Sequence, residues 1–101
     1  MKALKLEGVG VREIEIENEL EALQEAVDGY IETVTLVQGR AVMIVNEEGL
    51  LRGMSPNPIA SLAAGTQIVG PALVVGVDGE EFTDIPEDIK QRVMKFGREY
   101  K

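Results

Sequence analysis

One stretch of the chain, Asn46–Pro58, concentrates the polar side chains best suited to binding a small ligand. Glycines and prolines restrict its motion, and Arg52 is its one basic residue. Asn57 followed by Pro58 predicts the start of a short helix, where free backbone N–H groups attract an anion. The same composition also suits a loop in which Asn and Pro only cap and turn the chain. The candidate residues for a small anionic or nucleotide-like ligand are Asn46, Glu47, Arg52, Ser55 and Asn57.

Acidic side chains alternate along a predicted strand, Val11–Glu17, and continue into the segment after it. Alternate residues of a strand lie about 6.6 Å apart on one face, so these carboxylates would form a line of negative charge. That line predicts a surface for a basic host protein, in the manner of a DNA mimic, although one DNA strand carries about twice that charge density. An ordinary acidic surface that keeps the protein soluble is the other interpretation. The candidate surface consists of Glu13, Glu15, Glu17 and Glu21, flanked by Glu19 and Glu25.

The residue types that are missing exclude most kinds of catalytic site. The chain contains no His, Cys or Trp, so a Ser-His-Asp triad, a Cys-His pair and a His- or Cys-based zinc site are impossible. Neither a Walker-type nor a GxGxxG phosphate loop occurs. Glu47 and Glu48 could ligate a hard cation, but adjacent residues at a strand end point apart and suit a plain turn. We expect a protein that is not an enzyme and has no cofactor and no metal.

Length and composition are those of one domain, residues 1–101, with a single core. Hydrophobic residues make up 45% of the chain, an ordinary value for globular proteins. No apolar run approaches the roughly 18 residues of a membrane span, and the N-terminus lacks the apolar segment of a signal peptide. The net charge of −8 opposes direct binding to nucleic acid or to an anionic membrane. We expect the protein in the cytoplasm.

The elements that must position these candidates are organised around Ala41–Val45, a run of apolar residues that predicts a strand buried on both faces. Gln38-Gly39 predicts a hairpin turn that folds the strand Tyr30–Val37 back against this run. A further buried strand is predicted over Gln67–Val77. Gly70-Pro71 interrupts it and predicts a bulge or an edge position there.

A helix over Glu19–Asp28 is predicted between the first two strands, Met1–Leu6 and Val11–Glu17, and the hairpin. Asn18 would cap this helix, with Glu21 as its capping-box partner. Gly29 suits the left-handed position after the last turn. The apolar stripe expected to face the sheet consists of Leu20, Leu23, Val27 and Tyr30.

Two further helices complete the predicted fold. A short one over Ile59–Ala64 ends at Gly65, and a C-terminal one begins at Pro86. The fold class is therefore α+β, with a single small antiparallel or mixed sheet of about five strands. A helix in the N-terminal half, a short middle helix and the C-terminal helix pack on this sheet. The core-facing residues expected in the C-terminal helix are Ile89, Val93, Phe96 and Tyr100.

Three blocks of the chain together resemble a family of small acidic proteins of bacteria, phages, plasmids and other mobile elements. They are EIENELEALQEAVDGYIE, NEEGLLRGMSPN and IVGPALVVGVDGEEFTDIPEDI, at residues 15–32, 46–57 and 68–89. The family is a domain of unknown function, so it brings no activity and no assigned residues. Asp28 stands where a second glycine is expected, and Ser55-Pro56 where two prolines are expected. The resemblance implies a small protein of a mobile element, a setting in which antagonism of host defence is common.

These observations support two hypotheses of different class. The first is a non-enzymatic protein that sequesters a small nucleotide-like signal of host defence at the Arg52 loop. The second is an acidic inhibitor of a basic host protein, of the antirestriction DNA-mimic type. We also expect a homo-oligomer, most simply a dimer, because apolar residues cluster in and after the loop. The alternative is that they fold under onto the sheet. They are Leu50, Leu51, Met54, Ile59 and Leu62.

Overall fold

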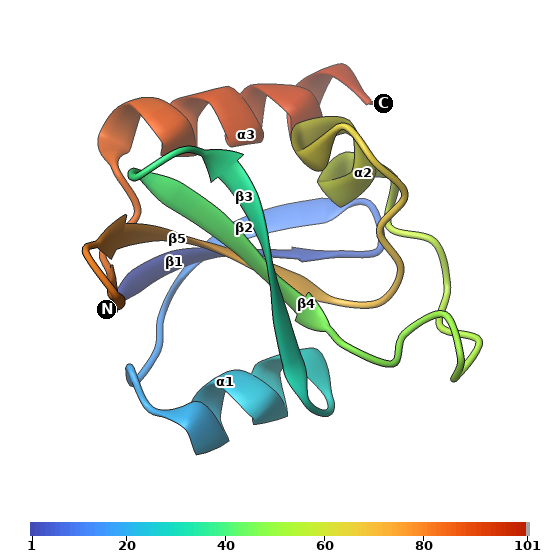
Figure 1. The fold of residues 1–101 in the computed structure, drawn as a ribbon. Helices are drawn as coiled ribbons and strands as arrows, with labels where there is room; N and C mark the ends of the chain where they lie inside the picture. Colours follow the sequence, from blue (N-terminus) through green and yellow to red (C-terminus); the bar gives the residue numbers. More distant parts are fainter. Residues whose placement is uncertain (101) are drawn as a thin grey trace.

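The computed structural model describes residues 1–100 and has one antiparallel sheet with helices on both faces, which confirms the predicted α+β class (Figure 1). Helix α1 lies on one face, and α2 and α3 lie on the other. In chain order the elements are β1 (Lys2–Glu7), β2 (Gly10–Glu15), α1 (Leu20–Val27), β3 (Ile31–Val37), β4 (Ala41–Asn46), α2 (Pro58–Ala64), β5 (Ala72–Asp78), β6 (Glu81–Thr83) and α3 (Glu87–Glu99).

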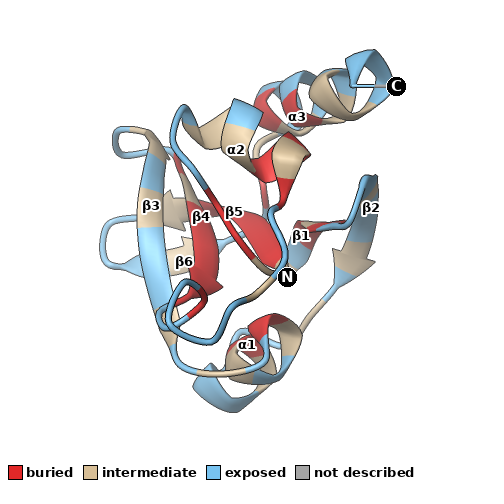
Figure 2. Ribbon diagram, turned by 90° about the vertical axis from the view of Figure 1, so that its right-hand side faces the viewer, coloured by how far each residue is buried: buried red, intermediate tan, exposed pale blue. Residues whose placement is uncertain are grey.

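The centre of the sheet is formed by β4 and β5, in the strand order β2-β1-β5-β4-β3. Ile44 of β4 lies opposite Leu73 of β5, and both side chains are fully buried. The prediction that Ala41–Val45 is a strand buried on both faces is therefore confirmed, and Figure 2 shows these two strands as the most buried part of the sheet. Strands β2 and β3 form the two edges, while the short β6 pairs with the end of β5.

Two separate hydrophobic cores lie on the two faces of the sheet. The larger core lies under α2 and α3 and includes Leu6, Met43 and Val74. The smaller core lies under α1, where Leu23 and Val27 contact side chains such as Ile44. This division follows from the alternation of side chains along the strands, because neighbouring residues of β4 and β5 point to opposite faces. Within residues 1–100, none of the helices has the length and hydrophobicity needed to cross a membrane.

Helix α1 differs from its prediction at both ends. Asn18 does not cap it: Glu19 occupies the N-cap position, and the Asn18 amide donates instead to the Phe82 carbonyl oxygen at 2.9 Å. Asp28, not Gly29, takes the left-handed conformation at the C-cap, with φ 63°. Leu20 is 59% exposed and Tyr30 is 63% exposed. The predicted stripe was wrong at these two positions: Tyr30 lies beyond the end of α1, Leu20 is exposed in its first turn, and only Leu23 and Val27 are buried.

Two predicted strands are shorter in the structure. The strand predicted over Gln67–Val77 begins at Ala72, because Gly70 has φ 77° and Pro71 lacks a backbone donor. Val69 before them makes an isolated bridge to Pro56. The strand predicted over Val11–Glu17 ends at Glu15. The short strand β6 was not predicted from the sequence.

The middle helix agrees with its prediction in detail. Asn57 is the N-cap residue of α2, its side chain accepts from the Ala60 N–H, and Pro58 occupies the first turn. Gly65 ends the helix in the left-handed conformation, with φ 70°. Helix α3 buries Ile89 and Val93 as predicted, whereas Tyr100, at the C-cap, is 45% exposed.

Candidate functional site

The loop between β4 and α2 is held by its own backbone hydrogen bonds. The N–H of Arg52 donates to the Glu48 carbonyl oxygen at 2.9 Å, and the N–H of Met54 donates to the Gly49 carbonyl oxygen at 3.0 Å. Gly53 takes a positive φ of 68°, which glycine adopts without strain. The candidate residues of this loop therefore have fixed positions.

Asn46 is buried and fixes the start of the loop to the end of α1. Its side-chain amide donates to the carbonyl oxygens of Val27 and Asp28, both at 3.0 Å. Its side-chain oxygen accepts from the Glu48 N–H at 2.7 Å. Because the amide is already bonded on both its nitrogen and its oxygen, Asn46 holds the fold together here and has little left to offer a ligand.

Arg52 is bound to the residue that ends α1. Its guanidinium donates to the Asp28 carbonyl oxygen and lies 3.3 Å from the Asp28 carboxylate. A side chain at Gly29 would lie 2.7 Å from the Asn46 amide nitrogen and 3.0 Å from the Arg52 guanidinium, so only glycine fits beside this cluster. The Arg52 side chain is 43% exposed, but its charge already faces a carboxylate. An incoming anion would have to compete with Asp28.

Asn57 and Ser55 lie at a different place, beside the turn between β1 and β2. Asn57 is 1% exposed, and its amide donates to the carbonyl oxygens of Leu6 and Gly70, both at 2.9 Å. Ser55 is exposed. Both residues line a cavity of about 250 Å³ that Met54 and the Gly70-Pro71 segment complete. The buried Asn57 thus joins three segments of the chain and caps α2.

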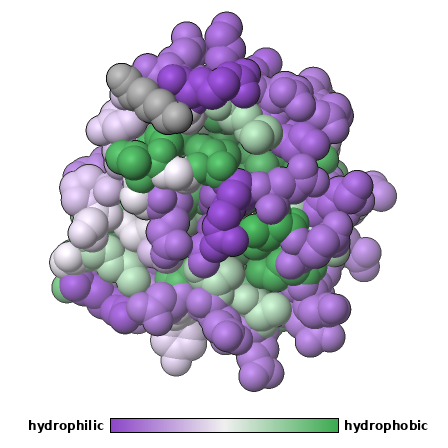
Figure 3. Space-filling view, turned by 180° about the vertical axis from the view of Figure 1, so that it is seen from behind, coloured by the Kyte–Doolittle hydropathy of each residue, from purple (hydrophilic) through white to green (hydrophobic). Residues whose placement is uncertain are grey.

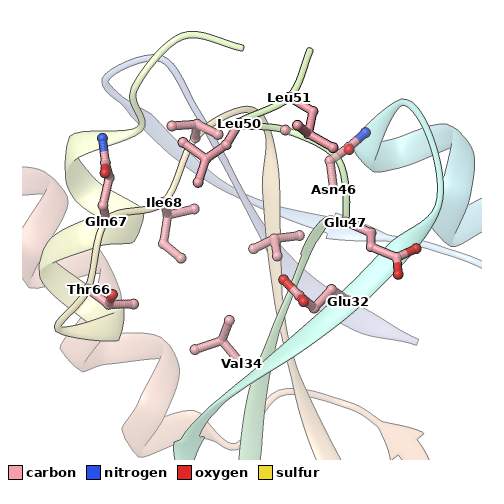
Figure 4. A pocket seen from close by; sticks show the side chains of 12 residues that line it. Glu32, Val34, Asn46, Glu47, Leu50, Leu51, Thr66, Gln67 and Ile68 are labelled. Carbon is pink, nitrogen blue, oxygen red and sulfur yellow. The ribbon is translucent and has the colours of Figure 1, made fainter. Parts of the chain in front are cut away.

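A larger cavity of about 500 Å³ lies beside the edge strand β3, and we call it the β3 cavity. Four segments contribute to it: β3, the end of β4, the following loop and the connection from α2 to β5. Figure 4 shows that Glu32 turns its carboxylate toward the cavity, whereas the side chains of Glu47 and Asn46 point away from it. Its lining residues are Glu32, Val34, Val45, Asn46, Glu47, Gly49, Leu50, Leu51, Thr66, Gln67, Ile68 and Val69.

The structure therefore separates the candidate loop residues. Asn46 and Glu47 line the β3 cavity, Ser55 and Asn57 line the smaller one, and Arg52 lines neither. Sequence reasoning missed Glu32, although the alternation of the strand that contains it places Glu32 and Val34 on one face. No sequence signal brings the connection from α2 to β5 to the same place.

The candidate acidic surface is divided in a similar way. Glu13 on β2 pairs with Lys90 of α3 at 3.1 Å, and this hydrogen bond raises the pKa of Lys90. Glu15 lies 3.6 Å from the N-terminal ammonium group. Among residues 1–100 no ion pair involves the remaining carboxylates of this surface, which are Glu17, Glu19, Glu21 and Glu25.

A second ion pair connects the β3–β4 hairpin to α3. Both terminal nitrogens of the Arg40 guanidinium donate hydrogen bonds to the Asp88 carboxylate, each at 2.8 Å. This hydrogen bonding lowers the pKa of Asp88 to about 2 and raises the pKa of Arg40. Helix α3 is therefore connected by ion pairs to β2 through Lys90 and to the hairpin through Asp88.

The fold and its cavities define a small α+β domain with a continuous antiparallel sheet and a half-open cavity at one sheet edge. The chain belongs to the family described as a domain of unknown function, DUF3846, whose model matches residues 1–98. The resemblance noted in the sequence is thus confirmed at the level of a family of unknown function. Comparisons with curated proteins and with solved structures gave no match.

Proposed function

We propose that this chain is a non-enzymatic binding protein and that its ligand occupies the β3 cavity. The observation that carries the proposal is the cavity itself, whose volume of about 500 Å³ falls within the range typical of small-molecule sites. Its lining is mostly apolar, with a few polar groups that would orient a ligand. Such a combination is characteristic of binding sites in general.

The charge of the cavity favours a ligand that joins an apolar group to a positive charge. Glu32 turns its carboxylate toward the space, and no Lys or Arg is among the lining residues. A primary or secondary amine beside Glu32 would gain a charge-assisted hydrogen bond while its apolar part contacts Val34 and Ile68. The nucleotide-like ligand expected from the sequence would instead need Arg52, which lies outside this cavity.

Two probes of matched shape and opposite charge test the ligand class. Phenethylamine and 3-phenylpropionate are titrated into the labelled protein, and backbone amide shifts are followed by NMR. We expect the amine to shift the resonances of Val34 and Ile68, and Glu32→Gln to weaken that binding several-fold. Glu21→Gln, an exposed carboxylate on α1, serves as the control and should have no effect. Equal binding of the two probes, or none of either, would overturn the proposal.

Arg52→Ala separates this proposal from a phosphate-binding role of the loop. Arg52 does not line the β3 cavity, so the variant should bind phenethylamine as the native protein does. If inorganic phosphate or adenosine monophosphate binds the native protein and Arg52→Ala abolishes that binding, the anionic ligand is the correct one.

A second candidate function is inhibition of a basic host protein by the acidic surface, in keeping with the mobile-element setting that the sequence resemblance implies. The observation that favours it is the set of carboxylates without an ion pair among residues 1–100, which are Glu17, Glu19, Glu21 and Glu25. Inhibition of DNA cleavage by a purified restriction endonuclease should then weaken steeply with salt. Reversing these four charges should abolish it, and Arg52→Ala should leave it unchanged.

A further inference from the structure

The outer side of β3 presents a row of unpaired backbone groups. The Glu47 N–H donates to the Tyr30 carbonyl oxygen at 2.8 Å, which fixes the hydrogen-bonding phase of the β3–β4 ladder. Because hydrogen-bonded positions alternate in an antiparallel pair, Glu32 and Val34 direct their backbone groups toward β4. Ile31, Thr33 and Thr35 therefore direct their N–H and C=O groups away from the sheet.

The side chains of this strand do not protect the edge. Proteins commonly blunt an edge strand with Lys, Pro or charges at its centre. The sequence of β3, IETVTLV, contains no Lys, Arg or Pro, and Glu32 is its one charged residue. Thr33 and Thr35 are exposed, and β3 forms the free rim of the sheet in Figure 2, with no described element beyond it. A register shift interrupts the strand between Thr35 and Val37, so the edge is open to a further strand over Ile31–Thr35.

We propose that β3 pairs antiparallel with β3 of a second copy of this chain, around a twofold axis at Thr33. In that register Thr33 lies opposite the partner's Thr33, and Ile31 lies opposite the partner's Thr35. The outward backbone groups of both strands then form the hydrogen-bonded pairs of a new ladder. The two sheets become one continuous sheet, and the interface is isologous, as in most homodimers.

The charge distribution favours a second copy at this edge. Each chain carries a net charge of −8, so two copies repel each other unless they meet where charge is sparse. In the Thr33 register Glu32 lies opposite the partner's Val34, so no two carboxylates are directly opposed. Facing pairs of β-branched residues, such as Thr33 with the partner's Thr33, are favourable across antiparallel strands.

The same pairing extends the β3 cavity. Glu32 and Val34 line that cavity, and pairing places the partner's Val34 and the partner's Glu32 beside them at its rim. Leu50 and Leu51, which are 71% and 88% exposed, lie on the same cavity. Of the apolar cluster expected to mark an interface, Ile59 is instead fully buried, so the cluster is only partly a surface. The dimer joins two cavities across one twofold axis.

A single introduced cysteine tests the register. The chain has no Cys, so Thr33→Cys carries the only thiol. Directly opposed residues of a hydrogen-bonded antiparallel pair have Cα atoms about 5.5 Å apart, within the range that a disulfide spans. We expect Thr33→Cys to form a covalent dimer in a glutathione redox buffer. Thr83→Cys, the same substitution at an exposed position of β6, is the matched control and should remain a monomer in denaturing electrophoresis.

Light scattering across two orders of magnitude of concentration tests the dimer itself. The native protein should give twice the chain mass of 11.0 kDa. Thr33→Lys should raise the dimer dissociation constant about tenfold or more, because two ammonium groups then face each other. A cooperative thermal transition of the Thr33→Lys monomer would show that this variant is folded, so that its weaker dimer does not result from unfolding. A native mass of one chain at every concentration, or cross-linking of Thr33→Cys no faster than that of Thr83→Cys, would overturn the proposal.

Discussion

The two edges of the sheet, β2 and β3, are held in opposite ways. On β2 the hydrogen bonds between Met1 and Ile16 set the ladder phase, so Val11, Glu13 and Glu15 direct their backbone groups outward. The centre of that edge is a carboxylate paired with Lys90, which brings α3 over the strand. The view from behind Figure 1 shows many hydrophilic side chains with apolar patches between them (Figure 3).

Strand β3 is fixed by contacts on its inner side, toward β4 and α1, and no element contacts its outer side among the described residues. Asn46, buried beneath its first residues, lies opposite Ile31 and binds the end of α1. The outer side of β3 therefore needs no covering element for stability, and it has none among the described residues. An edge strand can thus be fixed in position without being covered, and only such a strand can pair with another strand in one defined register.

The largest effect on stability is expected from a charge buried in the interior of the sheet, between the β2 and β3 edges. Ile44 on β4 is fully buried and packs in the smaller core. Ile44→Asp would bury an unpaired carboxylate and should cost on the order of 4 kcal/mol or more, a large part of the stability of a small domain. We expect no cooperative thermal transition by circular dichroism. A soluble variant that melts cooperatively would contradict the central position of β4.

A smaller loss is expected where β3 is fixed from within. Asn46→Ala removes three hydrogen bonds and leaves the buried Val27 carbonyl oxygen without its side-chain donor. The free energy of unfolding should fall by about 2 kcal/mol in urea titrations. Asn18→Ala, which removes one exposed hydrogen bond, is the control and should cost clearly less. Equal losses in the two variants would mean that Asn46 does not fix β3.

Removing the Glu13 charge should make the β2 edge more like the β3 edge. Glu13→Thr deletes the partner of Lys90 and gives β2 a threonine at an outward-bonding position like that of Thr33 in β3, while Arg12 and Glu15 remain. A chain with two open edges can pair at both, which produces assemblies that do not close. We expect species larger than the dimer in sedimentation velocity, with little change in stability. Glu21→Thr on α1 should leave the distribution unchanged. The absence of larger species would show that the charge is not what protects β2.

The smallest effect concerns the ion pair that connects the hairpin of β3 and β4 to α3. The pKa of Asp88 is lowered to about 2, against about 3.9 in an unfolded chain. A lowered pKa stabilises the fold above the unfolded value, and this contribution is lost as the pH falls from about 4 through about 2. Asp88→Asn should therefore reduce the urea midpoint slightly at pH 6, and the difference from the native protein should shrink toward pH 2. Asp78→Asn, an exposed Asp at the end of β5, should have no such pH dependence.

Local sequence signals predicted much of the fold because the interactions behind them are local. The Asn57-Pro58 start of α2 and its end at Gly65 depend on residues within one turn. The ends of α1 could not be predicted, because Asn18 is used by Phe82, far away in the sequence. The role of Asn46 was missed for the same reason, since its partners are at the end of α1. The loop that the sequence singles out as a candidate binding site contributes only part of the β3 cavity, which combines four segments that only the folded chain brings together.

The unequal division of the core has a consequence for motion. Only Leu23 and Val27 of α1 are buried, and they cover the smaller of the two cores. Elements with few buried contacts open at a lower free energy than the rest of a domain, as cooperative units of their own. In native-state hydrogen exchange, the amides of α1 should therefore exchange through a sub-global opening while those of β4 and β5 wait for complete unfolding. The face of the sheet under α1 then opens before the face under α2 and α3, and this opening also breaks the hydrogen bonds from Asn46 to the end of α1.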